Sequence, residues 1–262
     1  MKYYLLISCI IFSISYLSAS EKIKKDEWGE FYRLNNIEGC FVLYDMKADK
    51  YYIYNEKRAN EGFLPASTFK IPNSLIALET GAVKDENEVI KWDGIDKGLE
   101  AWNHDHDMKS AIKVSCVWFY QEIARRIGEK RMQHYIDSIG YGNKNIGDKI
   151  DNFWLVGRLR ITPMQQIEFL KRLYHNNLPF SQRSLDIVKN ILIVEKTDSY
   201  ILRAKTGRSS GDKNDNGWWI GYIEKGGNVY FFANNVDINK EEDANARMEI
   251  TKNILRSMQL YR

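Results

Sequence analysis

Residues 65–82 read PASTFKIPNSLIALETGA, and they place a lysine inside an apolar stretch. Lys70 follows Ser67 by three positions and lies between Phe69 and Ile71. Residues three apart share one face of a helix, so the two side chains are within reach of each other. A serine hydroxyl needs a neighbouring base, whereas an ordinary lysine is protonated at neutral pH. Burial disfavours the ammonium form, so the placement of Lys70 predicts a neutral amine beside Ser67.

The composition describes one ordinary globular unit. The chain has 262 residues, a hydrophobic content of 44% and a formal net charge of +3. No linker, repeat or low-complexity tract interrupts residues 25–262, so we expect a single domain over residues 21–262. The charge is small and shows no clustered basic face, so we expect no nucleic-acid partner.

The first 20 residues contain the three parts of a secretory signal peptide. Lys2 precedes an apolar run at 5–14, and small residues follow as far as Ser20. The run is shorter than the roughly 20 residues that a membrane-spanning helix needs. We expect cleavage after Ser20, a mature protein in the periplasm or secreted, and no membrane anchor in the mature form.

Strand patterns occur toward both ends of the chain, and helical patterns fill the middle. The predicted strands are 39–46, 51–54, 199–205, 217–224 and 228–236, with a hairpin turn at Gly226-Gly227. The predicted helices are 68–78, 117–127, 129–139, 163–174, 182–192 and 241–258. This order predicts an α/β protein of the α+β type, in which N- and C-terminal segments form an antiparallel sheet flanked by helices, with an inserted helical subdomain. We expect the site where the sheet meets the helical part.

Three other short motifs accompany Ser67 and Lys70 in chain order. They are Ser115-Cys116-Val117, Tyr141-Gly142-Asn143 and Lys205-Thr206-Gly207. The last motif ends a predicted strand, where glycine permits close approach of a ligand and the lysine and threonine hold an anionic group. Each motif alone is a weak signal, and the interpretation depends on their joint occurrence.

With its PASTFK, SCV, YGN, KTG and GWWIGY segments, the chain resembles the class D, oxacillinase-type serine β-lactamases over about residues 30–260. The resemblance implies a β-lactamase/transpeptidase-like fold and hydrolysis of the β-lactam amide bond of penicillin-type antibiotics through a Ser67 acyl-enzyme, which confers resistance. It implies small-molecule β-lactam substrates and no cofactor beyond the carbon dioxide or bicarbonate that carboxylates Lys70. The resulting carbamate is the implied general base for acylation and deacylation.

The same resemblance implies roles for further residues. Backbone N–H groups of Ser67 and Arg208 form the oxyanion hole. Ser115 and Lys205 relay a proton to the departing ring nitrogen. The remaining implied roles are a carbamate pocket of Val117, Trp154 and Leu155, substrate binding by Thr206, Gly207 and Arg247, and a structural motif of Tyr141, Gly142 and Asn143.

Other interpretations remain open on the residues alone. Trp154 is also compatible with plain core packing, and Arg247 with a solvated helix face. A β-lactam sensor shares S-T-F-K and K-T-G but acylates without turnover, and a penicillin-binding D,D-peptidase has a similar serine-lysine spacing. Sensors carry membrane-spanning segments and a cytoplasmic effector, for which we expect no room here. The FWL segment at 153–155 favours the class D interpretation over the peptidase.

We assign no function to two other groups of residues. His104 and His106 suggest zinc, but two residues apart on a helix they point to different sides and lack a third ligand, so we expect no metal. Cys40 and Cys116 are expected as free thiols, with one disulfide as the alternative. The sequence leaves open the substrate spectrum, including oxyimino-cephalosporins and carbapenems, and whether the protein is a monomer or a homodimer.

Overall fold

The computed structural model describes residues 20–147, 149–209, 215–241 and 243–262. Within these residues, seven strands form one sheet in the order β1-β3-β2-β7-β6-β5-β4. The expected signal segment lies outside the described residues, apart from Ser20. The strands are β1 (Glu21–Lys24), β2 (Gly39–Asp45), β3 (Lys50–Tyr54), β4 (Ile193–Lys196), β5 (Tyr200–Ser209), β6 (Asp215–Lys225) and β7 (Asn228–Ile238).

The predicted antiparallel sheet built from both ends of the chain is confirmed, with one parallel pair of strands. Every neighbouring pair of strands is antiparallel except β1 and β3, which are parallel. The tight connection between β6 and β7 follows from two glycines, since Gly226 and Gly227 have φ values of 60° and 72°. Positive φ at both central residues is what a two-residue type I′ hairpin requires.

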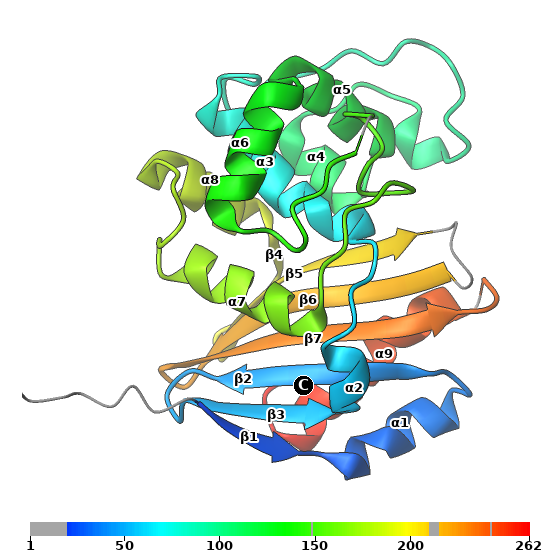
Figure 1. Cartoon of the computed structure of the whole chain (residues 1–262), viewed down its shortest axis with the longest axis vertical. Coiled ribbons are helices and arrows are strands. Elements are labelled where there is room, and N and C mark those ends of the chain that lie inside the picture. Colours follow the sequence, from blue (N-terminus) through cyan, green and yellow to red (C-terminus); the bar gives the residue numbers. More distant parts are fainter. Residues whose placement is uncertain (1–19, 148, 210–214, 242) are drawn as a thin grey trace, which may run out of the picture.

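The helical part lies to one side of the sheet, above it in Figure 1, and contains α3, α4, α5, α6 and α8. Helix α7 packs on one face of the sheet, while α1 and α9 lie on the opposite face (Figure 1). The helices are α1 (Gly29–Leu34), α2 (Glu56–Ala59), α3 (Lys70–Glu79), α4 (Met108–Lys113), α5 (Val117–Ile127), α6 (Glu129–Ile139), α7 (Pro163–Tyr174), α8 (Gln182–Ile191) and α9 (Asp243–Ser257). Short 3-10 helices are η1 (Asp26–Trp28), η2 (Ala66–Phe69) and η3 (Glu100–Trp102).

Two hydrophobic cores form, one on each face of the sheet. Strand β2 shows how the sequence supplies both, because alternate side chains of a strand point to opposite faces. Cys40, Val42 and Tyr44 join the core beneath the helical part and α7, whereas Phe41 and Leu43 join the core beneath α1 and α9. Burial on both faces explains why this strand is apolar throughout rather than alternating.

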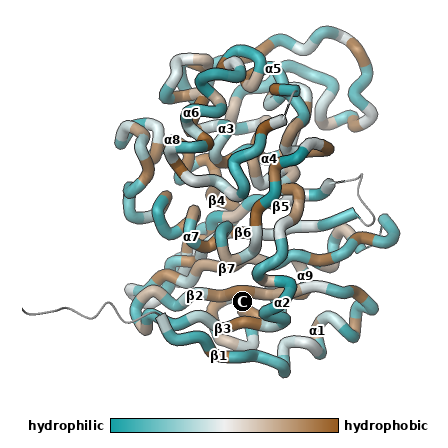
Figure 2. The backbone as a smooth tube through the Cα atoms, viewed as in Figure 1, coloured by the Kyte–Doolittle hydropathy of each residue, from teal (hydrophilic) through white to brown (hydrophobic). Residues whose placement is uncertain are grey.

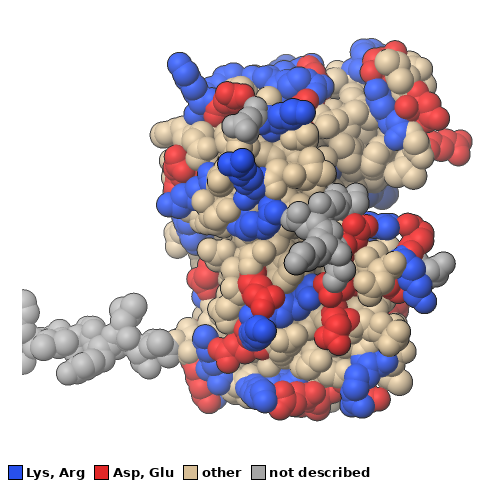
Figure 3. Space-filling view, turned by 45° about the vertical axis from the view of Figure 1, so that its right-hand side comes forward, with Lys and Arg blue, Asp and Glu red and all other residues tan. Residues whose placement is uncertain are grey.

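Hydrophobic and hydrophilic residues alternate along the backbone, both in the helical part and in the sheet with its covering helices (Figure 2). Among the described residues, no helix is long and apolar enough to cross a membrane. On the face shown in Figure 3, basic and acidic side chains occur over both the helical part and the sheet, which is consistent with the small net charge.

Candidate active site

The segment that carries Ser67 lies directly against strand β5. Ser67 belongs to η2, and Lys70 is the first residue of α3. A Cβ at Gly207 of β5 would lie 3.0 Å from Pro65 O and 3.2 Å from Thr68 Cγ2. A side chain at this position would be tighter than ordinary contact, so the glycine favours the close approach that places the Lys205-Thr206-Gly207 motif beside the serine.

Ser67 and Lys70 are joined by a hydrogen bond, as their spacing predicted. The distance from Lys70 Nζ to Ser67 Oγ is 2.8 Å. Lys70 is fully buried, and burial lowers the pKa of its amine from 10.5 to about 7. The amine is therefore close to half neutral at pH 7, as the apolar sequence around it predicted.

The backbone before the serine is strained. Ala66 has a φ of 49°, a conformation that costs a residue with a side chain roughly 1–3 kcal/mol. Its N–H donates to Trp154 O at 2.9 Å, and the hydroxyl of Thr68 donates to Pro65 O at 2.7 Å. These hydrogen bonds keep Ala66 at its unfavourable φ and thereby fix the orientation of Ser67.

Trp154 packs against Phe69, the residue that precedes Lys70. Its ring stacks on Phe69 with centroids 5.4 Å apart, and its side chain is fully buried. The indole nitrogen has no hydrogen-bond partner among the described residues. Val117 begins α5, and Leu155 is partly buried against the same core.

Ser115 and Lys205, which are 90 residues apart in sequence, meet in the fold. Lys205 Nζ donates to Ser115 Oγ at 2.9 Å and to Thr206 O at 3.0 Å. Burial, followed by the charges of Lys70 and Arg247, lowers the pKa of Lys205 well below its usual value. The hydrogen bond between Lys205 and Ser115 is a path along which a proton can pass between the two side chains.

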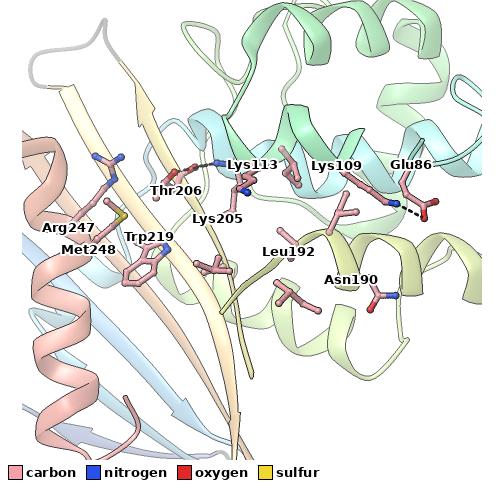
Figure 4. A pocket seen from close by; sticks show the side chains of 15 residues that line it. Glu86, Lys109, Lys113, Asn190, Leu192, Lys205, Thr206, Trp219, Arg247 and Met248 are labelled. Atoms are coloured by element: carbon pink, nitrogen blue, oxygen red, sulfur yellow. Dashed lines mark hydrogen bonds and ion pairs between the residues drawn. The ribbon is translucent and has the colours of Figure 1, made fainter. Parts of the chain in front are cut away.

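A cavity of about 620 Å³ opens beside this pair. Figure 4 shows Arg247 and Met248 projecting from α9 at one end, near Thr206, while Lys109 and Glu86 form an ion pair at the other. Arg247 is partly buried, and burial followed by the charge of Arg208 lowers its pKa to about 10. Arg247 therefore lines the cavity instead of lying on a solvated helix face.

The Tyr141-Gly142-Asn143 motif supports the site from outside. Gly142 has a φ of 55°, and a Cβ there would overlap the carbonyl oxygen of Arg160. The Asn143 side chain donates to Arg158 O at 2.9 Å. The Tyr141 ring packs edge-on against Phe69, with centroids 5.7 Å apart, so this motif helps to fix the segment that carries Ser67.

Residues 39–256 match the family described as the penicillin binding protein transpeptidase domain. The chain is 45% identical to Beta-lactamase OXA-48 of Klebsiella pneumoniae, covering 91% of this chain and 90% of that protein. The crystal structure of the class D β-lactamase YbXI from Nostoc is 47% identical, with a TM-score of 0.88, and the match covers 89% of this chain and 98% of that one. A class D β-lactamase from Fusobacterium nucleatum subsp. polymorphum has a TM-score of 0.89 at 40% identity, covering 92% and 100% of the two chains. The chain belongs to the class D β-lactamases.

This class D β-lactamase also contains buried polar residues that the sequence motifs did not predict. Gln166 of α7 is fully buried, and its amide donates to Thr68 Oγ1 at 2.9 Å. Ser74 of α3 donates to Lys70 O at 2.8 Å. A glutamine within the apolar face of a predicted helix is the signal for Gln166, whereas Ser74 carries no comparable signal.

Expectations for the two cysteines, for Arg208 and for metal binding remain to be compared with the structure. Cys40 and Cys116 are buried and free, which confirms the free thiols. The oxyanion role of Arg208 stays a prediction, because the contacts of this residue concern its side chain, which pairs with Glu241 at 2.7 Å. In the part of the chain that the structure describes, no group of three or more His, Cys, Asp or Glu side chains is arranged to hold a metal ion.

Proposed function

We propose that this protein hydrolyses the amide bond of β-lactam antibiotics through an acyl-enzyme on Ser67, and thereby confers resistance to penicillin-type drugs. The observation that carries the proposal is the buried amine of Lys70, with a pKa of about 7, held 2.8 Å from Ser67 Oγ. A hydroxyl in this position has a base beside it without any other group moving. The relatives at 40–45% identity are β-lactamases, which disfavours a sensor or a D,D-peptidase.

The residues around Lys70 also fit its carboxylation by carbon dioxide. A neutral amine is required, since its lone pair forms the N–C bond and a proton then leaves to solvent. Trp154 offers a buried indole N–H with no partner among the described residues, and such a donor suits an anionic acceptor. When present, the carbamate supplies an anionic general base beside Ser67.

In the proposed acylation, Ser67 Oγ attacks the lactam carbonyl carbon. The Ser67 proton leaves in the direction of the Lys70 side chain, which already contacts the hydroxyl. Backbone N–H groups of Ser67 and Arg208 are the proposed donors to the carbonyl oxygen, and such donors contribute about 3 kcal/mol each. The lactam C–N bond breaks, and the departing nitrogen receives a proton through the Lys205–Ser115 hydrogen bond.

The substrate carboxylate is the proposed ligand of the cavity beside this pair. Thr206 supplies a hydroxyl and Arg247 a guanidinium, and both residues line the cavity. A charged group that is partly buried interacts more strongly with an anion than an exposed one does. In deacylation, the oxygen of water adds to the Ser67 ester carbonyl, the ester C–O bond breaks, and a proton of that water goes to Ser67 Oγ. The proton that Ser67 gave up in acylation returns through solvent to the Lys205–Ser115 pair, which restores the starting state.

The test is a stopped-flow time course with a chromogenic cephalosporin, in carbon dioxide-free buffer and with added bicarbonate. Many turnovers that accelerate with bicarbonate are the expected result, and Lys70→Ala should show none. A single stoichiometric burst would instead identify a sensor or a penicillin-binding protein. Repeated turnover at low pH that is indifferent to bicarbonate would overturn the carbamate.

Export and assembly are proposals that rest on other grounds. Export rests on the pattern in residues 1–20, and sequencing the N-terminus of protein from the periplasmic fraction or the medium tests it. An N-terminus at Glu21 is expected, and an intact Met1 would contradict it. Light scattering distinguishes a monomer from a homodimer.

A further inference from the structure

His106 lies in a hydrogen-bond network outside the residues discussed so far. The expectation that His104 and His106 share a helix and point to different sides is wrong. His106 lies in an extended segment that pairs with Ile90, and the two histidine rings contact each other with centroids 4.0 Å apart. The His106 side chain is 1% exposed, so its polar atoms need partners within the protein.

Both ring nitrogens of His106 have such partners. Nε2 lies 3.1 Å from Ala101 O, and Nδ1 lies 3.0 Å from Ser110 Oγ. Burial, followed by the charge of His104, lowers the pKa of His106, so the ring is neutral at pH 7 and carries one N–H. Because a carbonyl oxygen only accepts, that proton is on Nε2 and donates to Ala101.

Trp102, which follows Ala101 in η3, extends the hydrogen-bond network toward Ser115. Trp102 O accepts the indole N–H of Trp118 at 2.7 Å. The indole N–H of Trp102 in turn donates to Val114 O at 3.0 Å. The bonds at Ala101 and Trp102 fix the backbone of η3, and the Trp102 indole then fixes the carbonyl of Val114.

Val114 immediately precedes Ser115, whose backbone is strained. Ser115 has a φ of 59°, which a residue with a side chain adopts only when its surroundings hold it there. On the other side, the N–H of Cys116 donates to Ala111 O at 2.8 Å. The peptide groups on both sides of Ser115 are thus held, and Ser115 Oγ lies 2.9 Å from Lys205 Nζ.

We propose that His106 is a positioning residue for Ser115, acting through the Ala101 carbonyl, η3 and the Trp102–Val114 hydrogen bond. This inference rests on the proposed function, in which Ser115 and Lys205 protonate the departing nitrogen. That proton is needed when the lactam ring opens but not when the ester is hydrolysed. Loss of the His106 contact therefore slows acylation and leaves deacylation unchanged.

Two substitutions of His106 separate this role from a general structural one. A glutamine amide nitrogen reaches about the position of Nε2 and keeps a donor for Ala101, whereas an asparagine amide reaches only about that of Nδ1. His106→Gln should acylate within about twofold of the parent, and His106→Asn about tenfold more slowly, the loss expected for one hydrogen bond. Acylation is measured in the full chain by single-turnover stopped flow with a chromogenic cephalosporin. Deacylation is measured in excess bicarbonate as the decay of preformed acyl-enzyme after free substrate has been removed.

Trp102→Phe is the second variant, since it removes the indole N–H and keeps an aromatic ring. It should slow acylation about tenfold, like His106→Asn. The matched control is Trp92→Phe, because the Trp92 indole makes the same kind of bond, to Ile95 O at 2.8 Å, within its own loop. This control should acylate at the parent rate.

The outcomes distinguish the inference from the proposed function. A parent protein that never turns over refutes the proposed function itself. If the parent turns over, the positioning role is overturned by normal acylation in His106→Asn or Trp102→Phe, by equal slowing of acylation and deacylation, or by a His106→Gln variant as slow as His106→Asn.

Discussion

Replacing Lys70 with methionine should inactivate the protein and stabilise its fold. Burial lowers the pKa of this amine from 10.5 to about 7. The unfolded lysine keeps its ordinary pKa near 10.4, so at neutral pH folding forces a proton off the amine or buries it charged. At about 1.4 kcal/mol for each pKa unit, the lysine destabilises the fold by about 5 kcal/mol at pH 7 and below.

Methionine removes this penalty and fills a similar volume, but it loses the hydrogen bond to Ser67, which contributes about 1 kcal/mol. The expected net gain is therefore about 4 kcal/mol at pH 7. For a domain of this size, that corresponds to an increase in Tm of roughly 10 °C.

The gain should depend on pH in a defined direction. Between pH 7 and about 10.4 the unfolded lysine holds a proton that the folded lysine has lost, so the stability of the parent rises with pH. Below pH 7 both states hold the proton, and the difference between the proteins stays constant. The advantage of Lys70→Met should fall from about 4 kcal/mol at pH 7 to about 1 kcal/mol at pH 9.

Calorimetry of both proteins at pH 6, 7, 8 and 9 measures this dependence. The buffers exclude carbon dioxide, because a ligand that binds only the folded state would stabilise the parent. Lys113→Met, at an exposed lysine, is the control and should change stability by no more than about 0.5 kcal/mol. A Lys70→Met protein no more stable than the parent at pH 7, or an advantage that stays constant to pH 9, would refute a neutral buried amine.

Three further predictions concern the proposed hydrolysis. Trp154→Phe removes the unpaired indole N–H together with part of the ring system and keeps an aromatic ring, so it should raise the bicarbonate requirement and slow deacylation more than acylation in burst kinetics. Equal slowing of the two steps would contradict the assigned role of Trp154. Arg247→Gln should lower kcat/KM for penicillins by about 10- to 100-fold through loss of a charged hydrogen bond, and an unchanged value would exclude carboxylate binding there. Gly207→Ala places a Cβ 3.0 Å from Pro65 O, so it should displace β5 from Ser67 and lower the acylation rate by tenfold or more. A normal acylation rate would show that the close contact between β5 and the Ser67 segment is not critical.

The sequence predicted the long elements well where local signals mark their ends. Helices α5, α6 and α7 begin and end at the predicted residues. Gly128 lies between α5 and α6, Gly140 follows α6 with a left-handed φ of 61°, and Pro163 begins α7 after a capping Thr162. Such residues fix helix ends without help from the rest of the fold.

Short elements were not predicted, because tertiary contacts determine them. Strands β1 and β4 have four residues each and lie at the two edges of the sheet. Strand β1 pairs with β3, which is distant in the sequence, and the pairing of β4 with β5 contains a register shift between Ile193 and Glu195. Neither pairing can be read from a local pattern in the sequence. Helix α4 has six residues and depends on the capping pair of Asp107 and Ser110.

The site divides in the same way. The Ser67–Lys70 pair follows from helical spacing alone, whereas the contact between Ser115 and Lys205 requires the assembled sheet. The family resemblance supplied that second contact, since no periodicity connects the two residues. His106 was misinterpreted because its structure was assumed to be helical, and its true partners lie in a segment without regular periodicity.

The candidate site contains several features that are unfavourable for folding. Ala66 and Ser115 have positive φ values, and Lys70 and Lys205 are buried amines whose pKa values are lowered by burial. Each feature costs stability where a leucine or a glycine would not. Elsewhere most positive φ values of non-glycine residues fall on asparagine or aspartate, which tolerate them, although Lys144 and Gln259 are exceptions. The rest of the fold has capped helices, a type I′ hairpin and apolar side chains on both faces of the sheet. The two cores therefore supply the stability that allows a strained backbone to hold the buried amines of Lys70 and Lys205 at the candidate site. Substitutions that relieve this strain or charge should stabilise the fold and impair the chemistry together.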